Sequence, residues 1–322
     1  MLCKYCKKDV QSLALHVSEC LGINYATPTY VKNESVIERV FHHRPAKVNK
    51  NLLLQDDNDT MIVFTGDWHV GNSGTNHHQL ICDLNLLKQY PQIKIVFMGD
   101  MIDNYIPGAP GGGSHDAVAR VSDQKKIVEA ISKGLKNQVV GVIQGCHEEW
   151  SFKEDDFDFA DWMANTLDTC YLGFGGLIHL VAGDNSYDIG VAHKFRGGYV
   201  NPTSVGVNLY REIGPFDVGV TAHVHKPSMG VFEEQGRFIH VLTCGSYKEE
   251  DRHVARMRIT PVVPTMPAVI FKAKERKILS FFDFKDALPN FESMLGLRLL
   301  KKVVKNEVAN PSSPAPESDQ SP

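Results

Sequence analysis

Five apolar segments of the chain each end in aspartate, histidine or cysteine, and this repeat constrains the fold more than any other feature. The first is "MIVFTGDWHVG" at residues 61–71, and the pattern returns in "IKIVFMGDMID", "VVGVIQGCHEE", "YDIGVAH" and "FDVGVTAHVH". Glycine and aspartate commonly end strands, so one such ending predicts only a turn. Five endings together predict a shared site, because strand carboxyl ends meet at one edge of an open α/β sheet.

Helix-like segments alternate with these strands and span residues 77–90, 122–136 and 155–167. In the second of them, Ser122 is a candidate N-cap, and Ile127, Val128, Ile131 and Leu135 follow at helical spacing. Strand and helix in alternation predict an α/β domain.

Composition limits the class of protein. With 322 residues, 43% of them hydrophobic, the chain can bury one large core. No apolar stretch approaches the roughly 18 residues of a membrane span, and no signal-peptide segment is visible, so no membrane partner is expected. The seven cysteines do not form a secreted disulfide framework. We therefore expect a cytoplasmic or other reducing intracellular location.

The first twenty residues predict a small zinc finger. In "CKYCKKDVQSLALHVSEC" the candidate ligands of one structural zinc are Cys3, Cys6, His16 and Cys20. The segment resembles the fingers of bacterial Ros/MucR-type regulators, although Cys20 stands where those fingers often have histidine. Such a finger could tether the chain to DNA, RNA or a protein. A frayed N-terminus with coincidental cysteines is the alternative.

The five strand endings also carry a family resemblance. The series D-x-H, G-D-x-x-D, G-x-H-E, H and H-x-H, each after an apolar run, resembles the calcineurin-like metallophosphoesterases over roughly residues 61–250. This resemblance implies a four-layer α-β-β-α sandwich with a two-metal centre at one edge. The expected organisation is a finger at 1–24, a linker at 25–59, the phosphoesterase domain at 60–285, a C-terminal helix at 286–305 and a disordered tail at 306–322.

The resemblance also implies roles for individual residues. The implied metal ligands are Asp67, His69 and His225 for the first metal, His193 and His223 for the second, and Asp100 between both. His147 resembles the family's general acid or phosphate-contacting histidine, and Asp103 resembles the carboxylate that orients it. The cofactors would be two divalent transition metals, namely Mn, Zn, Fe or Ni.

Two positions depart from the family pattern. Cys146 stands where the family usually has an asparagine ligand. A thiolate there could bind the second metal and would favour Zn or Fe over Mn or Mg, or it could be a buried spectator, and both interpretations stay open. Asn104 follows Asp103 where protein phosphatases have arginine, which disfavours a phosphoprotein substrate.

The predicted function is a metal-dependent phosphoesterase acting on mono- or diesters. Two cations would bind the phosphoryl oxygens and convert water to an attacking hydroxide. Lys194, Arg196 and Asn104 are candidate contacts to the substrate, although charged loop residues are more often simply solvated. The finger suggests a nucleic-acid or nucleotide substrate. The alternative function is a nucleic-acid-binding or protein-binding regulator with a degenerate, inactive phosphoesterase domain.

Overall fold

A computed structural model describes residues 50–106, 116–197, 201–249 and 263–296 of the chain. The predicted zinc finger, with Cys3, Cys6, His16 and Cys20, lies outside the described residues, and so do the predicted tail and most of the glycine-rich segment after Asp103. None of the helices among the described residues is both long and apolar enough to cross a bilayer.

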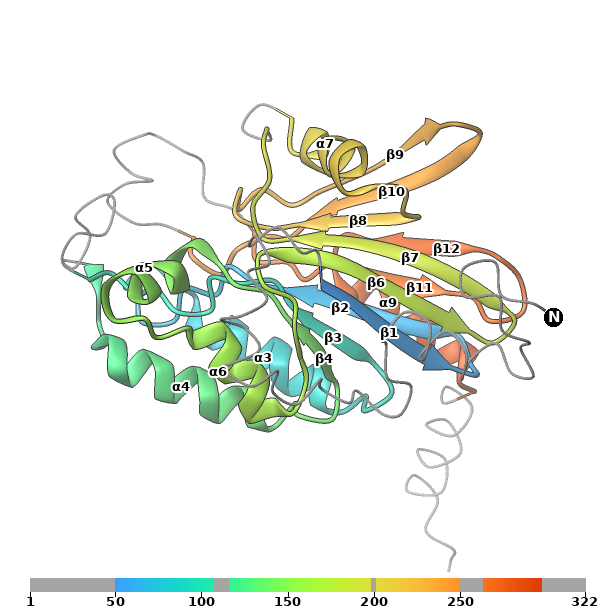
Figure 1. Cartoon of the computed structure of the whole chain (residues 1–322). Coiled ribbons are helices and arrows are strands. Elements are labelled where there is room, and N and C mark those ends of the chain that lie inside the picture. The colour runs from blue at the N-terminus through green and yellow to red at the C-terminus, as the bar shows by residue number, and fades with distance from the viewer. Residues whose placement is uncertain (1–49, 107–115, 198–200, 250–262, 297–322) are drawn as a thin grey trace, which may run out of the picture.

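Two six-stranded sheets face each other (Figure 1). The first sheet has the order β12-β11-β2-β3-β4-β5 and consists of β2 (Thr60–Thr65), β3 (Lys94–Phe97), β4 (Val139–Val142), β5 (Cys170–Tyr171), β11 (Ala268–Phe271) and β12 (Ile278–Phe281). The second sheet has the order β1-β6-β7-β8-β10-β9 and consists of β1 (Lys50–Asp56), β6 (Gly175–Ala182), β7 (Asn185–Ala192), β8 (Val218–Thr221), β9 (Ser228–Glu234) and β10 (Arg237–Thr243). Within them, β2, β3 and β4 run parallel, as do β7 and β8.

Side chains of β2 alternate between two hydrophobic cores, because successive strand residues point to opposite faces. Met61 and Val63 pack with helices on the outer face of the first sheet, whereas Ile62 and Phe64 pack between the two sheets. A strand that is buried on both faces has apolar residues at successive positions, which explains the apolar sequence "MIVF" of β2.

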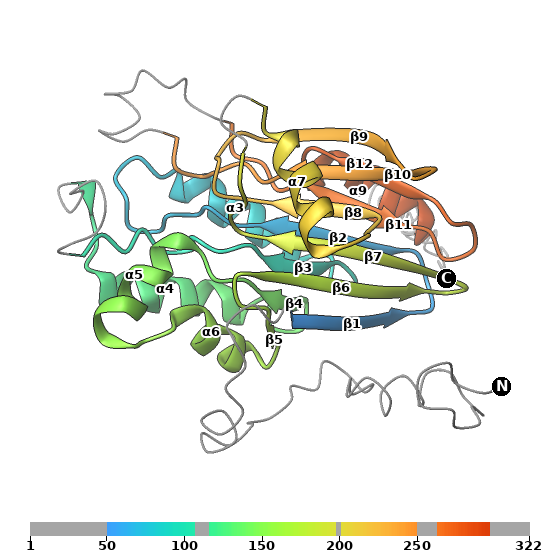
Figure 2. The ribbon, with the colours of Figure 1, turned by 45° about the horizontal axis from the view of Figure 1, so that its top comes forward.

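Helices cover both outer faces of the pair of sheets. The first sheet is covered by α3 (His77–Lys88), α4 (Val121–Lys133), α6 (Phe159–Leu167) and α9 (Phe284–Met294), which bury their apolar sides in one core. The second sheet is covered by α7 (Thr203–Ile213), through Leu209 and Tyr210. Figure 1 and Figure 2 show α7 on the opposite side of the sheets from α4 and α6. The four-layer α-β-β-α arrangement is therefore present.

Several predicted boundaries were wrong. Residues 50–56, assigned to the linker, form β1, which pairs in parallel with β6. Ser122 lies inside α4, whose N-cap is Arg120 in an extended conformation. The helix expected at 155–167 is instead α5 (Cys146–Asp155) followed by α6, because Asp156 adopts a left-handed conformation that ends α5. Of the helix expected at 286–305, the part after residue 296 lies outside the described residues; the described part belongs to α9, which begins at Phe284 and packs in the core of the domain.

Candidate metal centre

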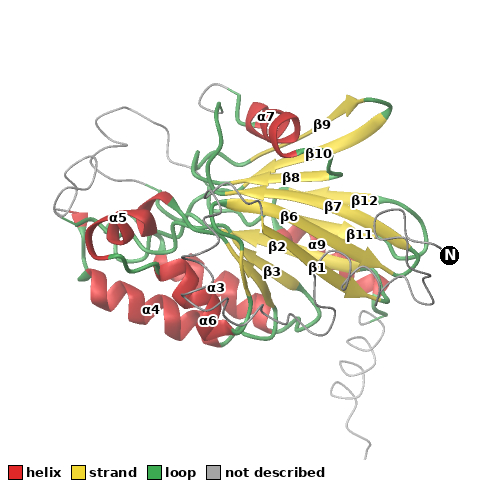
Figure 3. Cartoon of the chain, viewed as in Figure 1, coloured by secondary structure: helices red, strands yellow, loops and turns green. Residues whose placement is uncertain are grey.

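The seven predicted ligands of the two-metal centre lie just beyond strands whose ends converge near α5. Figure 3 shows loops between these strand ends and α5. The ligand candidates are Asp67 and His69 after β2, Asp100 after β3, Cys146 at the start of α5 after β4, His193 after β7, and His223 and His225 after β8. Both sheets therefore contribute to one site.

The first group contains Asp67, His69 and His225, whose candidate ligand atoms all lie within 4.8 Å of one another. The Nε2 atoms of His69 and His225 are 3.0 Å apart, and Nε2 of His225 is 3.7 Å from Oδ1 of Asp67. The other carboxylate oxygen of Asp67 accepts a hydrogen bond of 2.8 Å from the main-chain N–H of His223. Asp67 thereby fixes the loop that carries both histidines after β8.

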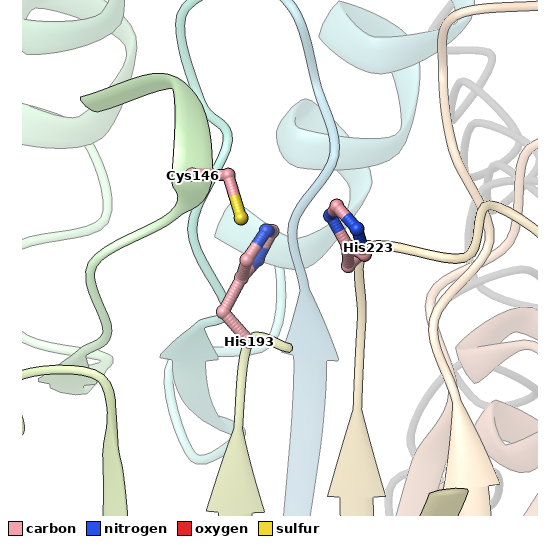
Figure 4. A group of neighbouring side chains, drawn as sticks. All are labelled: Cys146, His193 and His223. Atoms are coloured by element: carbon pink, nitrogen blue, oxygen red, sulfur yellow. The ribbon is translucent and has the colours of Figure 1, made fainter. Parts of the chain in front are cut away.

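The second group contains Cys146, His193 and His223, and its candidate ligand atoms also lie within 4.8 Å of one another. Figure 4 shows the three side chains pointing toward one another from the start of α5 and from the ends of β7 and β8. The Nδ1–H of His193 donates to the carbonyl of Met98 at 2.7 Å, which leaves Nε2 directed into the site. The sequence could not decide whether Cys146 faces this group, and the fold places its sulfur there.

Asp100 lies between the two groups. Its Oδ2 is 3.1 Å from Nε2 of His193, and Asp100 also forms compact clusters with Asp67 and with His69. The other oxygen, Oδ1, accepts a 2.7 Å hydrogen bond from the main-chain N–H of His147. A carboxylate has two oxygens that can bind different cations, so Asp100 stands where a bridging ligand would be needed.

Five of the seven candidate ligands have an unusual backbone conformation. Positive φ angles of 47° to 70° occur at Asp67, His69, Asp100, His223 and His225. Non-glycine residues enter this left-handed region at a cost in energy, and they cluster at functional sites where surrounding structure enforces them. The fold therefore holds these ligands in conformations that the local sequence alone would disfavour.

His147 is held by residues of the loop after β3. Its Nδ1 forms a short hydrogen bond with the carbonyl of Asp103, and a carbonyl can only accept, so Nδ1 carries the proton. Nε2 lies 4.0 Å from Oδ2 of Asp100. The contact predicted between Asp103 and His147 therefore runs through the main chain of Asp103. Its carboxylate is directed elsewhere, 3.4 Å from Nδ1 of His69 and 3.0 Å from Nδ2 of Asn72.

Two charged residues in the site were not predicted. Glu148 is fully buried, and its carboxylate accepts hydrogen bonds from the main-chain N–H groups of Asp100, Met101, Ile102 and Gly145. Glu148 thereby joins the loop of Asp100 to α5. The sequence contained a signal for this residue, because Glu148 is the glutamate of the G-x-H-E motif. Lys248 is buried beside Asp103, and its polar surroundings in the sequence gave no signal.

The three predicted substrate contacts differ from one another in their burial. Both ends of the Asn104 amide are used within the protein, because Nδ2 donates to the carbonyl of His147 and Oδ1 accepts from Ser151. Asn104 therefore supports His147, and its contact with the substrate stays a prediction. Arg196 is exposed and forms an ion pair with Glu212 of α7. Lys194 is also exposed, and its charge contributes to lowering the pKa of His223.

Electrostatics favour the neutral imidazole at His69, His223 and His225, whereas at His193 burial is outweighed by the charge and hydrogen bond of Asp100, which raise the pKa. Burial, followed by the charge of His193, lowers the pKa of His223 to about 4. Burial, followed by the charge of Lys248, lowers the pKa of His225 to about 3. Burial raises the pKa of Asp67 to about 8, and Asp100 acts in the same direction. Neutral imidazole is the form that binds metal, and buried carboxylates in such proximity favour a cation between them.

The donor set fits divalent metal ions. Oδ1 of Asp67 is buried without a hydrogen-bond partner among the described residues, although it points at the histidines of the first group. The Nε2 atoms of His69 and His225 are 3.0 Å apart, close enough for both to bind one ion. Imidazole and thiolate ligands suit Zn, Fe, Co or Ni, and the added carboxylates extend the range to Mn.

Comparisons with known proteins give distant matches. No protein-family model matches the sequence, and no curated protein matches it. The structure is similar to Vps29 of Chaetomium thermophilum, with 11% identity, coverage of 69% of this chain and 94% of that chain, and a TM-score of 0.35. It is also similar to the nuclease MPE of Pseudomonas putida, with 14% identity, coverage of 68% and 87%, and a TM-score of 0.34.

Proposed function

We propose that the protein is a metal-dependent phosphoesterase that hydrolyses phosphomonoesters or phosphodiesters. The observation that supports this proposal is the convergence of two compact ligand groups, Asp67/His69/His225 and Cys146/His193/His223, on either side of Asp100. Two groups that share a carboxylate are the arrangement needed to hold a pair of cations.

Some residues of the site would bind the metals, and His147 would transfer a proton. Bound divalent cations would supply Lewis acidity at the phosphoryl oxygens and lower the pKa of water. His147 would move the proton through Nε2, because Nδ1 is committed to the carbonyl of Asp103. The neutral ring can accept a proton at Nε2, and the protonated ring can donate it to the departing oxygen.

We also propose that Cys146 is a ligand of the second group. Its sulfur lies close to the ring nitrogens of His193 and His223. A thiol with no role in metal binding would not need to lie there. A thiolate is a softer donor than the amide usual at this position and should favour Zn or Fe over Mn.

A direct test loads metal-free protein with Mn, Zn, Fe or Ni and measures hydrolysis of bis(p-nitrophenyl) phosphate, p-nitrophenyl phosphate, and single- and double-stranded DNA. At least one metal should support hydrolysis, and the Asp100→Asn variant should lose it by a factor of about 100 or more, because removing a bridging charge disturbs both metal sites. Equal inactivity of wild type and Asp100→Asn on every substrate would favour the regulator hypothesis. DNA or RNA binding through the zinc finger stays a separate prediction.

A further inference from the structure

Lys248 is a nearly buried lysine beside the candidate metal centre, with 5% of its side chain exposed. Its position is fixed by the loop after β10, where the N–H of Lys248 donates to Oγ of Ser246 at 3.0 Å. Ser246 in turn donates to the carbonyl of Asp67 at 2.9 Å. Lys248 also pairs with Thr75 in an isolated β-bridge. The lysine is thus anchored to the same backbone that carries the ligands Asp67 and His69.

The ammonium group of Lys248 lies within the electrostatic reach of the site. Its Nζ is 3.7 Å from Oδ1 of Asp103, which is itself 3.4 Å from Nδ1 of His69. Nζ also lies 5.7 Å from the centre of the Tyr105 ring. After burial, the charge of Lys248 is the next largest cause that lowers the pKa of His69 and of His225. The lysine charge therefore acts on the first ligand group.

A buried cation at this place needs an explanation, because removing an ammonium from water costs several kcal/mol. Asp103 offsets part of that cost. Next to a pair of divalent cations, however, the lysine charge opposes metal binding. An additional positive charge becomes favourable when the site receives an anion, and lysine is a compact point charge that binds phosphate oxygens well.

We propose that Lys248 contacts a non-bridging oxygen of the phosphoryl group that the site binds. This inference rests on the proposed phosphoesterase function and assigns to Lys248 the substrate contact that the sequence suggested for Lys194, Arg196 and Asn104. Arg196 faces Glu212 on α7, and Asn104 is engaged with His147 and Ser151, so neither residue offers the same buried charge.

The test measures binding of inorganic phosphate to the metal-loaded protein by titration calorimetry, with metal content determined on the same samples. Lys248→Met should weaken phosphate binding by about tenfold or more, since a charge-assisted hydrogen bond is lost, and Lys248→Arg should retain part of the affinity. The matched control is Arg196→Met, an exposed cation that should leave phosphate affinity unchanged. Equal phosphate affinity in wild type and Lys248→Met would overturn the proposal, and so would wild-type protein that binds no phosphate.

A second comparison separates phosphate binding from simple neutralisation of Asp103. The double variant Asp103→Asn/Lys248→Met contains no unpaired buried carboxylate at this position, so its folding does not depend on the lysine. If Lys248 only neutralises Asp103, the double variant should bind phosphate as tightly as Asp103→Asn alone, and the proposal fails. We expect the double variant to bind about tenfold more weakly than Asp103→Asn.

Failure of this inference can be distinguished from failure of the proposed function, because phosphate binding requires no turnover. One outcome is that the wild type hydrolyses no ester, while Lys248→Met binds phosphate more weakly than the wild type. This result would contradict the activity and support the lysine contact. The opposite outcome is that the wild type hydrolyses an ester and that Lys248→Met has the same KM and the same phosphate affinity as the wild type. This result would support the activity and contradict the lysine contact.

Discussion

Oδ1 of Asp103 lies 3.4 Å from Nδ1 of His69, and both side chains are fully buried. A carboxylate behind a metal-binding histidine orients the ring and increases its basicity. Asp103→Asn should therefore weaken metal binding by about 10- to 100-fold. Chelator competition with Mn²⁺ or Zn²⁺ measures this change.

The pair of His179 and Asp188 provides a matched control for this carboxylate. Nδ1 of His179 is 2.6 Å from Oδ1 of Asp188 on the adjacent strands β6 and β7, where both side chains are partly exposed. Asp188→Asn removes the same type of contact and should leave metal affinity unchanged. Equal effects of the two substitutions would contradict the role assigned to Asp103.

Metal binding should stabilise the fold, because Asp67 and Asp100 are buried carboxylates that cations would neutralise. At a metal concentration of 100 times the dissociation constant, the expected gain in the free energy of unfolding is about 2.7 kcal/mol. Chelation should reverse this gain, and Asp100→Asn should show little of it. Differential scanning calorimetry with and without metal tests the prediction. A wild-type melting temperature that is insensitive to metal would contradict it.

Gly145 allows the start of α5 to approach the loop after β3. A Cβ at this position would lie 2.1 Å from the main-chain nitrogen of Asp100 and 2.4 Å from Oε2 of Glu148. Gly145→Ala should therefore displace Asp100 and reduce metal affinity by about tenfold or more, in addition to destabilising the fold by about 1–3 kcal/mol.

The control for this crowding is Gly134, where an added Cβ meets only the flexible end of Lys88 and a more distant carbonyl. Gly134→Ala should change neither metal affinity nor the free energy of unfolding by more than about 0.5 kcal/mol. Metal titration and chemical denaturation of both variants provide the comparison. Normal metal binding by Gly145→Ala would show that the loop can move without loss of the site.

The convergence of the candidate ligands could be predicted from the sequence because it follows from strand topology. Each ligand comes directly after an apolar run, and parallel strands bring such positions to a common edge. The start of α5 was harder to see, since the helix begins at Cys146 immediately after a strand ending and has no apolar stripe. The strand β1 was also missed, although the buried Leu52 and Leu54 alternate with the less buried Leu53.

The partners of charged side chains could not be predicted, because they depend on contacts between distant loops. The burial of Lys248 results from pairing of its loop with Thr75, and "YKEEDRH" looks like any solvated turn. Arg196 appeared to be a substrate contact because it follows His193 closely, but the position of α7 gives it Glu212 as a partner. Sequence spacing carries no information on such pairings.

Asp217 should stabilise the fold in a pH-dependent manner. Burial alone would raise the pKa of Asp217, but hydrogen bonds from the main chain of Asp188 and from Arg276 and Arg237 lower it. The stabilisation is therefore complete above the ordinary pKa of 3.8 and is lost as the pH falls through the lower folded-state pKa.

Asp217→Asn should lower the free energy of unfolding by about 2 kcal/mol at pH 7, with the difference from wild type decreasing below pH ~4. Urea denaturation between pH 3 and pH 7 measures both effects. Glu212→Gln, which breaks the exposed pair with Arg196, should cost no more than about 1 kcal/mol. A constant difference between Asp217→Asn and wild type across this range would contradict the assigned pKa shift.

Cys146 should determine which metals the second ligand group prefers. Its sulfur is placed with His193 and His223, and replacing a soft thiolate with a neutral amide shifts preference toward harder cations. Cys146→Asn should therefore lower the ratio of Zn²⁺ to Mn²⁺ affinity by about tenfold or more, measured by competition between the two metals. Cys82→Asn is the matched control, because Cys82 is an exposed thiol on α3 and should leave the ratio unchanged. An unchanged ratio in Cys146→Asn would show that the thiol is a spectator and that the second cation is held without sulfur.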